Sequence, residues 1–236
     1  MNAYPNFKNL TIIFIALFLG LGTVSAISQD LLQLSGQTYL GQYSKVKKQL
    51  DYETIEGNPY LDERLMIGIV TFKNGDKVSY YLRYDTFSDE VEYLQGESLL
   101  VITNKDNLDN ITLNDYKIVY ETYQNNNQNM EGYLLEVVSG QCNLYQKHKV
   151  EFVEAKPAIS SYHAPTPDHF QNKGTSWLFG CTPHPITLFT PDKKSLKEIM
   201  SSSYPEVAKY IKENKLRLNR EADLIPIFEY YNSIQD

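Results

Sequence analysis

Short strand-like segments separated by polar turns occupy residues 60–155, and this pattern limits the fold more than any other feature. Leu65–Phe72 and Lys77–Tyr84 are rich in apolar and β-favouring residues, and they flank Asn74-Gly75. An Asn-Gly pair accepts positive φ at both central positions of a two-residue turn, so these segments predict a β-hairpin. Further strands are predicted at Glu90–Gln95, Glu97–Thr103, Tyr116–Tyr123, Gly132–Val138 and Asn143–Glu154.

The connections between these strands are short and polar, which favours antiparallel pairing over helical crossovers. Helices are predicted at the C-terminal end. One covers Lys193–Met200, and a second opens at the capping-box sequence Ser203-Tyr204-Pro205-Glu206. A last helix begins near Asn219, and Pro226 inside it predicts a kink or a restart. The predicted fold class is therefore α+β: a mainly antiparallel β sheet, as a meander, sandwich or open barrel, with two or three C-terminal helices.

The predicted core takes apolar residues from both the strands and the helices. It comprises Leu65, Ile67, Ile69, Leu82, Val91, Ile118, Leu134, Val137, Phe152, Ile211, Leu224 and Phe228.

Residues 156–191 contain six prolines. Proline supplies no backbone donor to a sheet and blocks helix interiors. This stretch predicts a long ordered loop, with edge strands at most near Ser176–Phe179 and Ile186–Phe189.

The first 26 residues have the features of a cleavable signal peptide. Lys8 precedes an apolar run from Leu10 to Leu21, and Val24-Ser25-Ala26 follows the small-x-small pattern of a cleavage site. The run has about a dozen residues, whereas a spanning helix needs roughly 20. We expect an exported protein, periplasmic or extracellular, with no membrane span after cleavage. Residues 27–236 would form a single domain: β-rich 60–155, a Pro-rich loop 156–191 and a helical part 192–236.

Two cysteines, Cys142 and Cys181, follow the leader. In an oxidising compartment they can form a disulfide, and the alternative is two separate thiols.

The charge balance is acidic, with 22 Lys and Arg against 29 Asp and Glu. This argues against nucleic acid as a partner. From Asp192 to Arg220 the balance reverses, with eight Lys or Arg against four Asp or Glu. That segment is either a solvated helical face or a docking surface for an acidic partner.

Chemically reactive side chains gather in the Pro-rich loop. His163, His169, Cys181 and His184 carry imidazole and thiol groups, which are zinc ligands, and four would complete a tetrahedral site. The spacing of His163 and His169 matches no common zinc motif, and Cys181 is also a candidate for the disulfide. Zinc is therefore one alternative, and ordinary loop residues are the other.

Two further clusters are candidates for function. Asp85, Asp89, Glu90 and Glu92 could supply acid–base groups or bind calcium, or they could be the polar face of a half-buried strand. Tyrosines on the predicted strands could form a face that binds glycan or protein, or they could reflect β propensity alone. They are Tyr80, Tyr81, Tyr84, Tyr116, Tyr120, Tyr123 and Tyr133.

Three segments resemble a group of exported bacterial proteins of unknown function. They are Glu56–Asp62 (EGNPYLD), Leu82–Tyr93 with its Arg83-Tyr84-Asp85 sequence, and a C-terminal part with Asp223-Leu224 and Tyr230-Tyr231-Asn232. The resemblance implies a location in a bacterial envelope or outside the cell, and it implies no activity.

The sequence contains no nucleophile elbow, P-loop, H-E-x-x-H or dinucleotide glycine pattern after the leader. We therefore expect a non-enzymatic exported module that binds a protein, glycan or other envelope component through its sheet face or the Pro-rich loop. The alternative is a metal-dependent or carboxylate-based hydrolase with its site in the 163–184 loop.

Overall fold

The structure is a computed structural model and describes residues 50–157, 165–182 and 184–235. The predicted leader and His163 lie outside these ranges. Ten strands precede three α-helices: β1 Met66–Phe72, β2 Lys77–Asp85, β3 Glu90–Gln95, β4 Ser98–Val101, β5 Leu108–Leu113, β6 Tyr116–Asn125, β7 Gln128–Val138, β8 Cys142–Val153, β9 His169–Cys181, β10 Ile186–Phe189, α2 Lys193–Met200, α3 Tyr204–Glu213 and α4 Glu221–Ser233. Three short 3₁₀ turns, Tyr52–Thr54, Lys105–Asn107 and Ser201–Ser203, complete the described elements.

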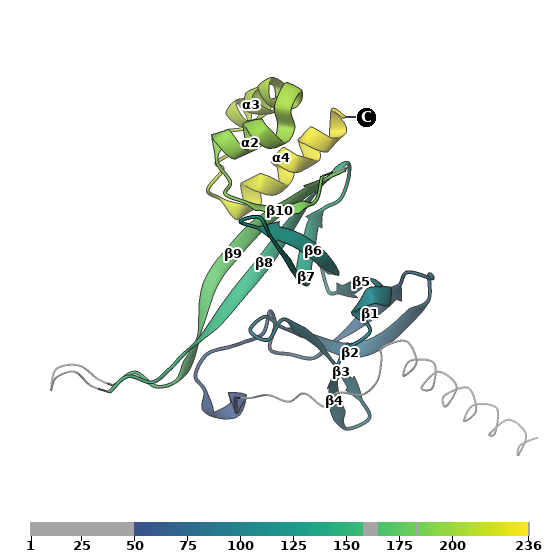
Figure 1. Cartoon of the computed structure of the whole chain (residues 1–236), viewed down its shortest axis with the longest axis vertical. Helices are drawn as coiled ribbons and strands as arrows, with labels where there is room; N and C mark the ends of the chain where they lie inside the picture. The colour runs from purple at the N-terminus through teal and green to yellow at the C-terminus, as the bar shows by residue number, and fades with distance from the viewer. Residues whose placement is uncertain (1–49, 158–164, 183, 236) are drawn as a thin grey trace, which may run out of the picture. The chain divides into compact units, whose positions relative to one another are not determined.

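The strands form one sheet in the order β10-β9-β8-β7-β6-β5-β1-β2-β3-β4 (Figure 1). Neighbours in this order pair antiparallel, as the short connections predict. The sheet also pairs β10 with β6 in parallel, so β6 to β10 close into a ring. Val119, Tyr123, Leu134, Tyr145 and Leu178 form a buried cluster contributed by these strands. The α+β class predicted from the sequence is confirmed.

The predicted first hairpin forms, but its turn is longer than two residues. Thr71 pairs with Lys77, and only Gly75 of the Asn-Gly pair has a positive φ, of 90°. The Asn74 side chain instead accepts a hydrogen bond from the Asp76 N–H at 3.0 Å. An Asx-type bond of this kind stabilises a longer turn, in which Asn74 does not need positive φ.

The next long hairpin extends further than the sequence pattern predicts. β6 and β7 pair up to Asn125 and Gln128, which leaves only Asn126 and Asn127 in the turn. Both have positive φ, 50° and 64°. Asparagine tolerates this conformation, so the two-residue turn matches the twist of the strands.

Two predictions about the strands need correction. In the Pro-rich stretch 156–191, the strand predicted at Ile186–Phe189 is confirmed as β10, but the one predicted near Ser176–Phe179 is part of a much longer strand, β9, of 13 residues. The prolines of this stretch fall on either side of β9, so they leave every ladder donor of this strand intact. The polar stretch before Tyr116 also contains a strand, β5, in which Leu108, Ile111 and Leu113 are buried.

The predicted inner face of β1 is also wrong. Ile67 and Ile69 are 63% and 43% exposed, whereas Val70 and Phe72 are buried. Side chains alternate along a strand, so Gly68, Val70 and Phe72 share the core face. Six of the other predicted core residues are buried: Leu82, Val91, Ile118, Leu134, Leu224 and Phe228.

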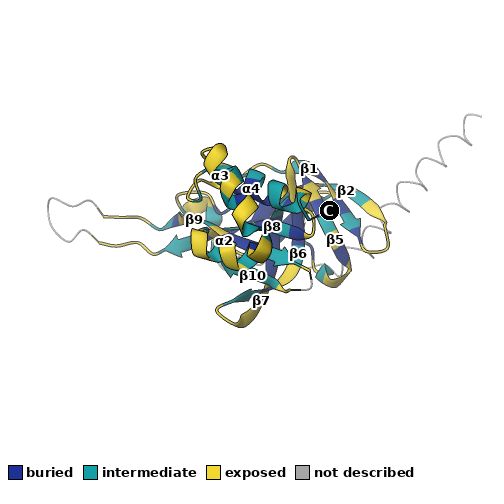
Figure 2. Ribbon diagram, turned by 90° about the horizontal axis from the view of Figure 1, so that it is seen from above, coloured by how far each residue is buried: buried dark blue, intermediate teal, exposed yellow. Residues whose placement is uncertain are grey.

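The three helices pack against the strands through a second buried cluster. Leu196 and Met200 come from α2, Val207 from α3, and Leu224, Ile227 and Phe228 from α4, and they meet Val138, Cys142, Leu144 and Trp177 of the sheet. In Figure 2 parts of the strands next to the helices are buried, while parts of α2 and α3 are exposed. Of the kink or restart predicted at Pro226, the restart does not occur, because α4 continues through this residue.

One side-chain amide adds hydrogen bonds between α4 and the sheet. The Asn232 Oδ1 atom accepts the Cys142 N–H at 3.0 Å, and its Nδ2 atom donates to the Cys142 carbonyl at 3.0 Å. The side chain therefore pairs with β8 as a neighbouring strand would. Gly140 leaves space for this amide, since a Cβ at residue 140 would overlap Asn232.

Candidate functional site

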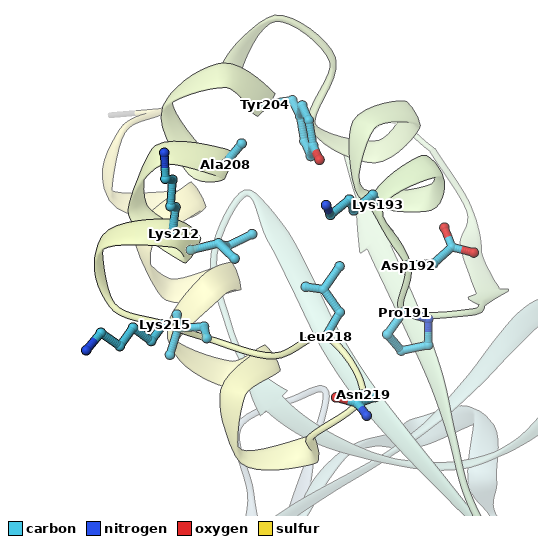
Figure 3. A pocket seen from close by; sticks show the side chains of 11 residues that line it. Pro191, Asp192, Lys193, Tyr204, Ala208, Lys212, Lys215, Leu218 and Asn219 are labelled. Carbon is cyan, nitrogen blue, oxygen red and sulfur yellow. The ribbon is translucent and has the colours of Figure 1, made fainter.

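A pocket of about 750 Å³ lies in the helical part of the protein (Figure 3). Its walls come from the segment before α2, from α3 and from the connection between α3 and α4. The apolar lining is Pro191, Tyr204, Ala208, Ile211, Leu216 and Leu218, and the polar lining is Asp192, Lys193, Lys212, Lys215 and Asn219. Hollows of this size lined mainly by apolar groups are typical of small-molecule sites.

The two helices that line the pocket begin in different ways. Asp192 caps α2, since its carboxylate accepts the Ser195 N–H at 2.8 Å. Ser203 does not cap α3, so the predicted capping box is wrong. The 3₁₀ turn before α3 leaves Ser203 in a helical conformation, and its hydroxyl accepts a hydrogen bond from Gln235 instead.

The C-terminal end of α3 forms the pocket floor through a Schellman motif. The Leu216 N–H donates to the Ile211 carbonyl at 3.0 Å, and the Lys215 N–H donates to the Lys212 carbonyl at 3.3 Å. This motif brings the side chains at its two ends together, here Ile211 and Leu216. Lys215 adopts a φ of 55°, in the left-handed region where glycine is usual.

The connection after α3 is held in place by α4. The Asp223 carboxylate accepts the Arg217 N–H at 2.8 Å and lies 3.9 Å from the Arg220 guanidinium. Leu216 and Leu218 pack at the edge of the buried cluster under the helices. The pocket wall is therefore continuous with the packed core.

The pocket has a positive rim. Lys193, Lys212 and Lys215 are exposed, and none forms an ion pair within the described residues. In Figure 3 the Lys193 ammonium and the Tyr204 hydroxyl point into the space between α2 and α3, whereas the Asp192 carboxylate points away. The ammonium groups of Lys212 and Lys215 also point away from the hollow. An apolar lining with the unpaired Lys193 ammonium at its mouth complements a ligand that is apolar and anionic.

The structure separates His169 from the other two described zinc candidates, Cys181 and His184, which lie at one tight turn where the His184 N–H donates to the Cys181 carbonyl at 2.6 Å. His169 and Cys181 are the first and last residues of β9, and 12 steps along a strand span about 40 Å. Cys181 is bonded to Cys142, so its sulfur is not a thiolate. The described residues contain no group of three or more His, Cys, Asp or Glu that could hold a metal ion.

The disulfide joins directly opposed residues of β8 and β9. Cys142 is buried beside α4, in the cluster that supports the pocket helices. Of the two alternatives for the cysteines, the structure therefore contains the bridge.

The acidic cluster at the end of β2 and in β3 is tied into buried interactions. Glu92 pairs with Arg83, with Oε2 2.6 Å from Nη2, and Asp89 pairs with Lys147 at 2.7 Å. Asp85 accepts the N–H groups of Phe87 and Ser88. Val91 lies on the opposite face of β3, in the core, as the alternation predicts.

Burial controls the protonation of this cluster. Desolvation raises the pKa of the Asp85 and Glu90 carboxyls and lowers the pKa of the Lys147 ammonium. The pKa of the Tyr84 hydroxyl rises for the same reason, and the charge of Asp89 raises it further. Three of the carboxylates have a cationic partner, namely Asp89 with Lys147, Glu90 with Lys105 and Glu92 with Arg83, which is typical of a structural network.

The tyrosines on the strands do not share one exposed face. Tyr84, Tyr93, Tyr123 and Tyr133 are buried, whereas Tyr81 is 50% exposed beside Ile67. β propensity and core packing therefore account for several of them.

Comparisons with known proteins found no matching family model, curated protein or solved structure. Among the described residues, no helix is long and apolar enough to cross a membrane. The assignment of the candidate site is therefore supported by its geometry alone.

Sequence reasoning located the positive segment Asp192–Arg220 but not the hollow within it. In the sequence, the apolar pocket residues have the spacing of the inner face of helices. Their spacing cannot show that α2 and α3 diverge and leave Ile211 and Leu218 half-buried. The excess of lysines was the available signal.

Proposed function

We propose that this protein is a non-enzymatic exported binding module, and that its ligand is an envelope component with an apolar body and an anionic group. The observation that carries the proposal is the apolar pocket with an unpaired lysine rim in the helical part. Lys193 directs its ammonium into the hollow, and Lys212 and Lys215 add positive charge outside it. A ligand with both properties gains from burial of its apolar surface and from charge complementarity.

Export is part of the proposal, and two observations support it. The first 26 residues have the charge and the apolar run of a signal peptide. The bond between Cys142 and Cys181 belongs to the chemistry of oxidising compartments. The resemblance to exported bacterial proteins points to the same location.

The proposed binding surface lies on the helices, not on the sheet face. The exposed side chains Ile67, Ile69 and Tyr81 lie on two paired strands, β1 and β2. The pocket, in contrast, is concave and combines apolar lining with positive charge. Concavity allows a small ligand to lose most of its contact with water.

A pocket-filling variant tests the proposal. The probe is 8-anilinonaphthalene-1-sulfonate, an apolar anion whose fluorescence rises when it is bound away from water. Ala208→Phe places a ring in the hollow and should weaken probe binding at least tenfold. Ala222→Phe is the matched control, because Ala222 is an exposed helix residue that does not line the pocket.

Folding of each variant is checked by the fluorescence of Trp177, which is buried under the helices. Equal probe binding by the wild-type protein and a folded Ala208→Phe variant would refute the pocket as the binding site.

A further inference from the structure

We propose that the ligand is a single-chain carboxylate, with its head group between Lys193 and Tyr204 and its chain along the apolar lining. This inference rests on the proposed function and names the ligand class of the same pocket. Three observations support it: the volume of the hollow, the positions of the two donors, and the single ammonium that points into the hollow.

The volume of the hollow suits a small ligand. Its 750 Å³ lies within the range of about 300–1,000 Å³ that is typical of small-molecule sites. A single acyl chain with its head group is a ligand of this size class.

Two donors stand at the mouth of the pocket without partners. The Tyr204 hydroxyl has no hydrogen-bond partner and the Lys193 ammonium has no ion-pair partner among the described residues. Both point into the space between α2 and α3 (Figure 3). One ammonium and one phenol can each donate to one oxygen of a carboxylate.

Among the described residues that line the pocket, only one cation points into the hollow. In Figure 3 the Lys193 ammonium lies in the space between α2 and α3, whereas the ammonium groups of Lys212 and Lys215 point away from it. A head group with one negative charge matches this single ammonium better than a doubly charged phosphate.

The hydrophobic wall continues from the donors toward the floor. Ala208 and Ile211 lie along α3, and Leu216 and Leu218 follow in the connection to α4. A chain anchored at Lys193 would lie against these residues. Its affinity should rise about fourfold for each methylene that becomes buried.

The experiment measures the binding of saturated carboxylates of 8 to about 16 carbons, and of the alcohol of matching length, by displacement of the fluorescent probe. The protein is purified in the form that the cell produces. For the wild-type protein we expect affinity to rise with chain length and then level off when the hollow is full. The carboxylate should bind about tenfold more tightly than the alcohol.

Two variants separate the head-group contact from general charge. Lys193→Gln should weaken carboxylate binding about tenfold and leave alcohol binding unchanged, and Tyr204→Phe should weaken carboxylate binding several-fold. Lys197→Gln is the matched control, because Lys197 is exposed on α2 and does not line the pocket.

The results that would overturn the carboxylate inference differ from the result that would refute the proposed function. Equal binding of carboxylate and alcohol, or equal effects of Lys193→Gln and Lys197→Gln, would overturn the carboxylate inference while the pocket itself stands. Capture by phosphatidylglycerol vesicles without binding of any monomeric carboxylate would overturn it as well. If Ala208→Phe did not weaken the binding of the fluorescent probe, the proposed function itself would be refuted.

Discussion

The contact between Asn232 and β8 predicts a strong energetic coupling to Gly140. Asn232→Ala removes two hydrogen bonds to the Cys142 backbone, at 3.0 Å each. It also leaves the N–H and carbonyl of a residue that is 1% exposed without these partners. Each lost bond lowers the free energy of unfolding by about 1 kcal/mol, and the unsatisfied groups lower it further. We therefore expect a total loss of about 2–3 kcal/mol.

Gly140→Ala should act through the same amide. A Cβ at residue 140 would overlap the Asn232 side chain and force it away from Cys142. The φ of Gly140 is not in the left-handed region, so alanine itself fits the backbone. In the wild-type background we expect a cost of about 2 kcal/mol. In the Asn232→Ala background the obstacle is gone, and the cost should fall below about 0.5 kcal/mol.

The assay is urea unfolding followed by the fluorescence of Trp177, which packs in the cluster that α4 completes. Ser233→Ala is the control on the same helix, because the Ser233 hydroxyl bonds only within α4, to the Tyr230 carbonyl. A Gly140→Ala cost that is the same in both backgrounds would refute the reasoning, since it would show that the amide and the glycine act independently.

Three further predictions concern stability. Replacing Cys142 and Cys181 together by alanine should lower the free energy of unfolding by about 4 kcal/mol, which is the chain-entropy value for a separation of 39 residues. Chemical denaturation of the wild-type and variant proteins measures this difference, and a loss below about 1 kcal/mol would contradict the prediction. Burial raises the pKa of the Asp85 carboxyl above its ordinary 3.8. The contribution of the protonated carboxyl to the free energy of unfolding is therefore complete below pH 3.8 and is lost as the pH rises through the raised pKa. The stability of the wild-type protein relative to Asp85→Asn should therefore fall as the pH rises above about 4, and a rise in urea titrations would show the wrong sign. Lys215→Gly should raise the melting temperature, because glycine avoids a left-handed strain of about 1 kcal/mol at φ 55°, and a lower melting temperature would argue against that strain.

The sequence predicts much of the sheet because its signals are local. β3 begins and ends at Glu90 and Gln95, and α2 covers Lys193–Met200, both as predicted. Turn residues and alternation determine such elements over a few positions. β9 was underestimated because the flanking prolines made the whole stretch resemble a loop, although none lies inside the strand.

Features that depend on distant contacts could not be predicted. The exposed position of Ile67 follows from which face of β1 meets the core, and alternation alone permits either face. The parallel contact of β10 with β6 joins segments about 60 positions apart. The pocket likewise depends on the angle between α2 and α3, which no local pattern specifies.

The most direct test of the central claim is an NMR titration of the ¹⁵N-labelled protein with dodecanoate, observing backbone amide shifts. We predict that the perturbed amides lie in residues 191–219, with the largest changes near Lys193, Tyr204 and Leu216, and that Ala208→Phe abolishes them. Perturbations centred on Ile67 and Tyr81 of the exposed sheet face, or no perturbation at saturating ligand, would contradict the account.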